Sequence, residues 1–159
     1  MPYEDTQVLP LDPGPLVLVV DDEITPRSIV GRMVRAIGYP ARNCRSGRDA
    51  LRFLAAHPGQ VRLLLADLGM PRMDGGELAE RARDLDPAIR VVLLVDPADA
   101  RAAELLHGYR DSPYLNKPVT FGDLYGWLQQ LLGTPPTGLS HPPSMTRSRV
   151  RRTSGQHEG

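Results

Sequence analysis

The chain has 159 residues, 41% of them hydrophobic and 24% charged, as in ordinary globular proteins, so we expect one domain with tails. The formal net charge is zero, but four arginines against one glutamate after residue 132 leave a mildly acidic body and a basic tail. A single cysteine excludes an intrachain disulfide, and the absence of a signal-type or membrane-length apolar run predicts a cytoplasmic protein without a membrane span.

Apolar runs alternate with amphipathic segments between residues 16 and 132. The runs 16–20, 61–67 and 90–95 are rich in branched side chains, which is typical of strands buried on both faces. Weaker strands are predicted near 39–44, where Pro40 indicates a sheet edge, and at 113–116. Helices are predicted over about 25–37, 48–56, 76–85, 98–107 and 121–131. Five strands alternating with five helices predict an α/β sandwich with a parallel sheet.

The first predicted helix has recognisable ends and one apolar face. Thr25 is a candidate N-cap, Pro26 suits the first turn and Gly38 can end the helix. At helical spacing, one face carries Ile29, Val30, Met33, Val34 and Ile37.

Charged side chains stand where the predicted strands end. Asp21 and Asp22 follow the first strand, Asp67 ends the third, and Lys117, the only lysine in the chain, follows the fifth. Sites in open parallel sheets form outside the carboxyl ends of the strands. If the first and third strands are neighbours, three carboxylates converge there and need a cation or a proton.

The chemistry of this group of residues points to phosphate. Oxygen-only ligands favour a hard cation, above all Mg²⁺ when phosphate is the substrate. A lysine supplies a compact charge for a phosphoryl oxygen, whereas the planar fork of arginine needs more room. A carboxylate beside a metal and a lysine can act as a nucleophile toward phosphorus.

Three segments, "VVDDE", "ADLGMPRMDG" and "YLNKP", resemble the signature segments of a bacterial response-regulator receiver domain of the single-domain chemotaxis type. The resemblance covers about residues 15–132. It implies a flavodoxin-like (βα)5 fold, a doubly wound three-layer sandwich with strand order 2-1-3-4-5. It also implies a cis peptide bond between Lys117 and Pro118.

The same resemblance assigns roles to the charged residues. Asp67 would be the phosphoacceptor, and Lys117 would contact the phosphoryl group and, before that, pair with Asp67. Asp22 would bind Mg²⁺ directly, Asp21 would help to hold it, often through water, and the Gly69 backbone carbonyl would be a further ligand.

The sequence departs from the family where the fourth strand ends. Receivers normally carry threonine or serine there, and its hydroxyl bonds the phosphoryl group; this chain has Val95. Asp96 follows, where the family prefers a small residue, and its carboxylate is positioned to repel phosphate. Tyr114 matches the family's rotating aromatic residue but lacks its usual trigger. We therefore expect its coupling to the phosphoryl group to be weakened or rewired.

Partners follow from the resemblance and from the tails. The expected phosphodonor is a phosphohistidine on a histidine kinase or phosphotransfer protein, and output is expected through protein contacts at about 98–132. Residues 1–15 read as a flexible lead-in, and the Pro/Ser/Arg-rich residues 133–159 as a disordered tail. That tail is too short for a helix-turn-helix, so sequence-specific DNA binding is not expected. Whether the chain forms a homodimer stays open.

Two rival functions remain open from the sequence. The first is a binding module of the same fold that no longer switches with phosphate, which Val95 and Asp96 favour. The second is a Mg²⁺-dependent phosphatase with an aspartyl nucleophile. Such enzymes typically carry Asp-x-Asp on one strand, whereas Asp21 and Asp22 are adjacent. We favour a phosphoacceptor domain that at most dephosphorylates itself weakly, rather than an enzyme.

Overall fold

The computed structural model describes residues 15–135, so most of the expected lead-in and tail lie outside the described residues. Five strands alternate with five helices. The strands are β1 (Leu16–Val20), β2 (Ala41–Cys44), β3 (Val61–Asp67), β4 (Arg90–Val95) and β5 (Tyr114–Asn116). The helices are α1 (Ile24–Ile37), α2 (Gly47–Ala56), α3 (Gly75–Leu85), α4 (Ala100–Gly108) and α5 (Phe121–Leu132).

The strands form one parallel sheet in the order β2-β1-β3-β4-β5. The predicted α/β, flavodoxin-like fold is therefore confirmed, as is the edge position of the strand that follows Pro40. β1 and β3 pair directly, with Val20 beside Ala66, so the residues that follow β1 lie next to the end of β3.

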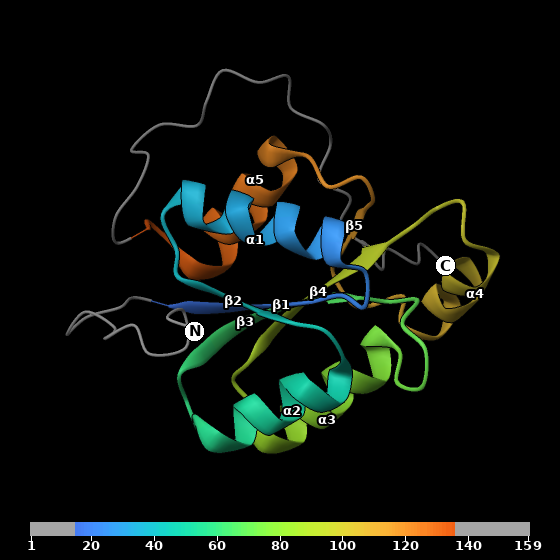
Figure 1. Ribbon diagram of the computed structural model, residues 1–159, viewed down its shortest axis with the longest axis horizontal. Helices are drawn as coiled ribbons and strands as arrows, with labels where there is room; N and C mark the ends of the chain where they lie inside the picture. Colours follow the sequence, from blue (N-terminus) through green and yellow to red (C-terminus); the bar gives the residue numbers. More distant parts are fainter. Residues whose placement is uncertain (1–14, 136–159) are drawn as a thin grey trace, which may run out of the picture.

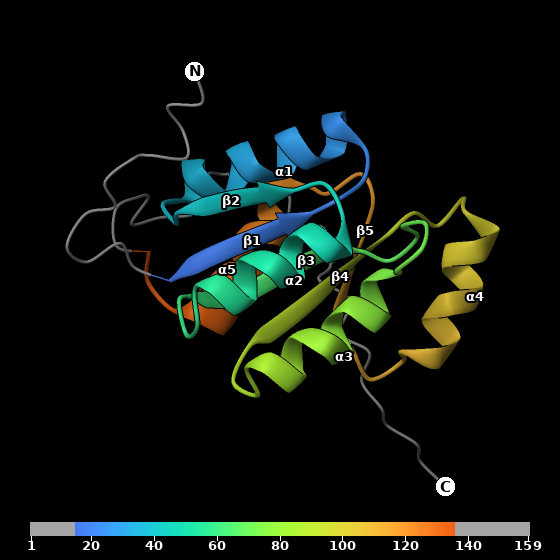
Figure 2. The ribbon, with the colours of Figure 1, turned by 60° about the horizontal axis from the view of Figure 1, so that its bottom comes forward.

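Helices cover both faces of the sheet, which explains why its central strands are apolar except at their ends and at Arg62. α1 and α5 lie on one face and α2 and α3 on the other (Figures 1 and 2). All five residues of β1 are buried, and alternate residues point into the two cores: Val17 and Val19 into one, Leu18 and Val20 into the other.

The first helix differs from its prediction in two details. It begins at Ile24 with Glu23 as the N-cap, without a side-chain cap hydrogen bond, so Thr25 is not the cap. Val30, Val34 and Ile37 are buried, but Ile29 is 47% exposed because it lies at the border of the apolar face. Gly38 ends the helix in the left-handed conformation, as expected.

α4 is held differently from the other helices. It lies beyond the carboxyl ends of the strands, to the side of the sheet, in both ribbon views. Ala102 is its only fully buried residue, while Leu105 and Leu106 are partly buried against the core. Along residues 15–135, no helix is both long and apolar enough to cross a membrane.

Candidate functional site

Three carboxylates converge at the carboxyl ends of β1 and β3. Asp21, Asp22 and Asp67 each place an oxygen within 4.8 Å of the others. Asp21 is 1% and Asp67 8% exposed, whereas Asp22 is open to solvent. The convergence predicted from the strand ends is therefore present, and it concentrates negative charge where little water can screen it.

Lys117 bridges two of these carboxylates. Its Nζ lies 3.0 Å from Asp67 Oδ1 and 2.8 Å from Asp21 Oδ2. The pairing with Asp67 was expected, but the shorter contact with Asp21 was not. The backbone N–H of Lys117 donates to the Val95 carbonyl at 2.7 Å, which anchors the lysine beside β4. The peptide bond to Pro118 is cis, as the resemblance implied.

Burial and charge act in opposite directions on the pKa values of this pair. Burial raises the pKa of Asp67 to about 6; Lys117 opposes the rise, and the charges of Asp21 and Asp22 add to it. Burial alone would lower the pKa of Lys117, but its bonds to Asp21 and the charge of Asp67 raise it above its ordinary value. The single charge of Lys117 therefore does not neutralise the negative charge of the three carboxylates, and a bound cation would be favourable there.

The oxygen atoms that remain available fit a hard cation. Asp21 Oδ1 accepts the Glu23 N–H at 3.0 Å, and Asp21 Oδ2 is occupied by Lys117. Asp22 is exposed, and within residues 15–135 no hydrogen bond or ion pair is found for its side chain. A set made only of carboxylate and carbonyl oxygens suits Mg²⁺.

The segment after β3 holds Asp67 through its backbone. Gly75 donates its N–H to the Leu68 carbonyl at 3.1 Å, and a Cβ at Gly75 would lie 2.5 Å from the carbonyl oxygen of Asp67. Asp74 caps α3 by accepting the Glu77 N–H at 2.9 Å. The "DG" part of the motif, Asp74 and Gly75, is thus explained by structure: a cap, then a glycine that lets α3 start against the strand end.

The positions expected to form a switch are spread over β4 and β5. Val95 is 2% exposed and belongs to the core, so its methyl groups stand at the end of β4 without a hydroxyl. Asp96 is exposed, and its Oδ1 accepts the Ala98 N–H at 2.9 Å, which shapes the β4–α4 loop. Tyr114 is half-buried against the core. The switching roles of these three residues stay predictions.

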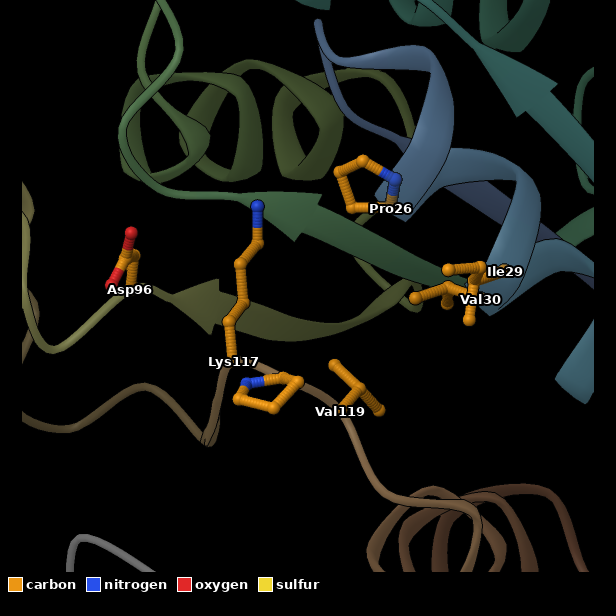
Figure 3. A pocket seen from close by; sticks show the side chains of 7 residues that line it. Pro26, Ile29, Val30, Asp96, Lys117 and Val119 are labelled. Carbon is orange, nitrogen blue, oxygen red and sulfur yellow. The ribbon is translucent and has the colours of Figure 1, made fainter.

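A pocket opens beside Lys117, between α1 and the β5–α5 loop (Figure 3). Its volume is about 280 Å³. Apart from Asp96 and Lys117 its lining is apolar: Pro26, Ile29 and Val30 from α1, and Pro118 and Val119 after β5.

Two arginines that the sequence did not single out contact the backbone of the site. Arg27 Nη1 donates to the Asp21 carbonyl at 2.9 Å, and Arg101 Nη1 lies 3.4 Å from the Gly69 carbonyl. Arg101 and Gly69 are 32 residues apart. No local pattern marks such a contact, because it depends on where α4 begins relative to the β3–α3 loop.

Comparison with known proteins gives concordant matches. A family model described as "Response regulator receiver domain" matches residues 17–129. The response regulator receiver protein CpdR of Brucella abortus is 29% identical over 116 residues, 73% of this chain and 95% of CpdR. The two-component response regulator ARR11 of Arabidopsis thaliana is 34% identical over 113 residues, 70% of this chain but only 21% of ARR11.

A solved structure extends the comparison to the fold. It is the co-crystal structure of the Saccharomyces cerevisiae histidine phosphotransfer signaling protein Ypd1 and the receiver domain of its downstream response regulator Ssk1. It matches with a TM-score of 0.63 at 21% identity, covering 76% of this chain and 89% of that chain. At this identity the likeness supports the fold alone.

Proposed function

This chain belongs to the response regulator receiver family and is a receiver domain of two-component phosphorelay signalling; from that premise we propose that Asp67 is its phosphoacceptor. The observation that carries the proposal is the contact of Lys117 Nζ with Asp67, 3.0 Å away, inside a cluster of three carboxylates. Asp67 is the last residue of β3 and is only 8% exposed, and its position directs Oδ1 toward Lys117.

The proposed reaction transfers a phosphoryl group from a phosphohistidine. A carboxylate oxygen of Asp67 attacks phosphorus, the O–P bond forms, and the N–P bond breaks. The imidazole nitrogen keeps the electron pair of that bond and takes up a proton. Lys117, already beside Asp67, then neutralises a phosphoryl oxygen, while Asp21 keeps the lysine in place from its other side.

The residues proposed to hold Mg²⁺ are Asp22, Asp67 and the backbone carbonyl of Gly69, with Asp21 assisting through water. When bound, the cation neutralises charge that would otherwise block attack on phosphorus. The residues of the chain supply the rest: burial of Asp67 excludes water from the nucleophile, and the backbone N–H of Glu23 orients Asp21.

For the phosphodonor, we propose docking on α1 and the pocket beside Lys117. Ile24 and Ile29 are large apolar side chains on α1 that are 69% and 47% exposed. Ile29 also lines the pocket beside Lys117, and exposed apolar side chains of this kind can pack against a partner that carries the phosphohistidine. We propose that the donor is a histidine kinase or phosphotransfer protein, and that output uses the surface of α4, β5 and α5 at about 98–132.

A phosphodonor experiment tests the function directly. Incubation with Mg²⁺ and acetyl phosphate, followed by intact-mass measurement, should show the gain of one phosphoryl group. That gain should vanish in Asp67→Asn and persist in Asp96→Asn, a charge-matched change outside the proposed nucleophile. An equal gain in Asp67→Asn would refute the assignment. Catalytic turnover of a generic phosphate ester would instead support the phosphatase alternative.

One observation favours a second candidate, a receiver-fold binding module that does not switch. Val95 places no hydroxyl at the end of β4, where a receiver uses one to pull the following loop toward phosphate. Backbone NMR shifts with and without beryllofluoride and Mg²⁺ separate the two candidates. Shift changes confined to residues beside Asp67 would support the module, and changes that extend into α4 would support a switch.

A further inference from the structure

Both ends of α4 are attached to the segment that follows Asp67. At its start, Asp99 caps the helix, and its Oδ2 would lie 2.9 Å from a Cβ at Gly69. Just past its end, the ring of Tyr109 fills the space above Gly76, where a Cβ would lie 2.1 Å from the ring. Because α4 buries only Ala102 fully, these attachments matter more for its position than they would for a deeply packed helix.

Arg101 provides the attachment closest to the phosphoacceptor. The Asp99 carboxylate accepts the backbone N–H of Arg101 at 3.0 Å, which fixes the residue in the first turn of α4. The side chain then reaches across to the Gly69 carbonyl, two residues after Asp67, with Nη1 and the carbonyl oxygen 3.4 Å apart. The guanidinium therefore stands at the edge of the site on an exposed side chain.

This contact is one that a guanidinium would readily exchange. At 3.4 Å it is longer than a normal N–H···O hydrogen bond, and its acceptor is neutral. A phosphoryl dianion accepts charge-assisted and often bidentate hydrogen bonds from arginine, about twice as strong as neutral ones. The Gly69 carbonyl is also a proposed Mg²⁺ ligand, and a second cation at the same oxygen is unfavourable.

We propose that Arg101 senses the phosphoryl group in this receiver, moving from the Gly69 carbonyl to a phosphoryl oxygen on Asp67 and drawing the start of α4 with it. It thereby replaces the hydroxyl that Val95 lacks. Other groups at the site are less suited to the role: Lys117 is anchored directly after β5 and already bound to two carboxylates, and Asp96 is an anion. The inference rests on the proposed phosphorylation of Asp67.

The test uses the full chain with beryllofluoride and Mg²⁺ as the phosphoryl mimic, followed by backbone NMR. In the wild type, binding should shift the resonances of residues 99–108. In Arg101→Gln the mimic should bind about tenfold or more weakly, the loss expected for one hydrogen bond to a charged group, and the shifts along α4 should shrink. Arg110→Gln removes the same charge from an exposed position beyond α4 and should behave as the wild type.

A double variant distinguishes a lost sensor from a damaged helix. Val95→Thr restores the hydroxyl, so Val95→Thr combined with Arg101→Gln should recover both the affinity and the α4 shifts. The inference is overturned if Arg101→Gln responds as the wild type does, or if the double variant responds no better than Arg101→Gln alone. If the wild type neither binds the mimic nor gains phosphate on Asp67, the proposed function fails first, and the inference fails with it.

Discussion

The surroundings of Asp67 disfavour the negative charge of its carboxylate. Its carboxyl is buried next to two other carboxylates, and its pKa is raised from 3.8 to about 6 although Lys117 is only 3.0 Å away. Between these two pH values the folded protein holds a proton that the unfolded chain has released. Stability therefore falls as the pH rises through this window, because the folded state must then accept the charge.

Replacing Asp67 by Asn should remove this pH dependence. In metal-free buffer, the difference in unfolding free energy between Asp67→Asn and the wild type should grow in favour of the variant from about pH 4 to pH 6. Above pH 6 it should level off. Urea denaturation over a pH series measures the difference. Asp84→Asn, which removes the same charge from an exposed position on α3, is the control. Its unfolding free energy should differ from that of the wild type by the same amount at every pH. If the difference in unfolding free energy between Asp67→Asn and the wild type is also independent of pH, the pKa of Asp67 is not raised.

Among single residues, the sequence predicts those site residues that lie at or directly after the end of a strand. Asp21, Asp22, Asp67 and Lys117 were predicted to converge because parallel strands end at a common edge. The sharing of Lys117 between Asp67 and Asp21 was not predicted, since it depends on side-chain geometry. Arg101 was missed because its partner is 32 residues away and belongs to a loop.

Among the elements, the junction of β3 with α3 has the tightest backbone contact of the site. Gly75 begins α3, and the carbonyl oxygen of Asp67 lies 2.5 Å from the position that a Cβ would take there. The end of β3 and the start of α3 are therefore so close that no residue with a Cβ fits at position 75 without a shift of the backbone. The orientation of the proposed nucleophile therefore depends on a residue that takes no part in the chemistry.

Gly75→Ala should destabilise the protein and impair phosphorylation together. A Cβ 2.5 Å from the Asp67 carbonyl forces backbone to move, which costs about 1–3 kcal/mol, and it displaces the Asp67 carboxylate. Gly122→Ala is the matched control, since nothing lies within 4 Å of a Cβ there and alanine favours α5 by up to about 1 kcal/mol. Denaturant midpoints and the rate of acetyl phosphate labelling measure both effects; equal behaviour of the two variants would contradict the tight junction.

The periodic pattern predicted the elements well, and their ends less well. The strands 16–20, 61–67 and 90–95 have the predicted bounds because apolar runs stop where the sheet stops. α1 starts at Ile24 rather than after a Thr25 cap, and α4 starts at Ala100 rather than Ala98 because Asp99 caps it. A cap depends on local backbone geometry, which several neighbouring polar residues could satisfy equally well.

On the scale of the whole molecule, the tail predicted from residue 133 onward begins with a residue that contacts the folded domain. The hydroxyl of Tyr39 donates to the Gly133 carbonyl, and Tyr39 is only 2% exposed. Burial raises the pKa of Tyr39, so this hydroxyl stays protonated and needs an acceptor. The fold therefore extends at least to Gly133.

A chain that ends at residue 132 should be less stable than one that ends at 135. Losing the Gly133 carbonyl leaves a buried hydroxyl without its acceptor, which costs about 1–3 kcal/mol. In the Tyr39→Phe background the difference should largely disappear, because no hydroxyl remains to be satisfied. Urea denaturation of the four chains completes the cycle. If shortening the chain lowers the unfolding free energy equally in the wild-type and Tyr39→Phe backgrounds, the contact of Tyr39 with Gly133 does not cause the loss.

The sheet order should make the stability of the whole molecule depend on a bound cation. The pairing of β1 with β3 brings three carboxylates together, and their repulsion acts on the fold as a whole. Mg²⁺ should relieve their repulsion and stabilise the fold by about 1.4 kcal/mol at tenfold its dissociation constant, about 3–8 °C in Tm. The gain should fade below about pH 6 as Asp67 takes up its proton. Thermal denaturation at constant ionic strength should show the gain in the wild type and Asp84→Asn, but not in Asp22→Asn. A gain of the same size in Asp22→Asn would mean that the cation binds away from the carboxylate cluster.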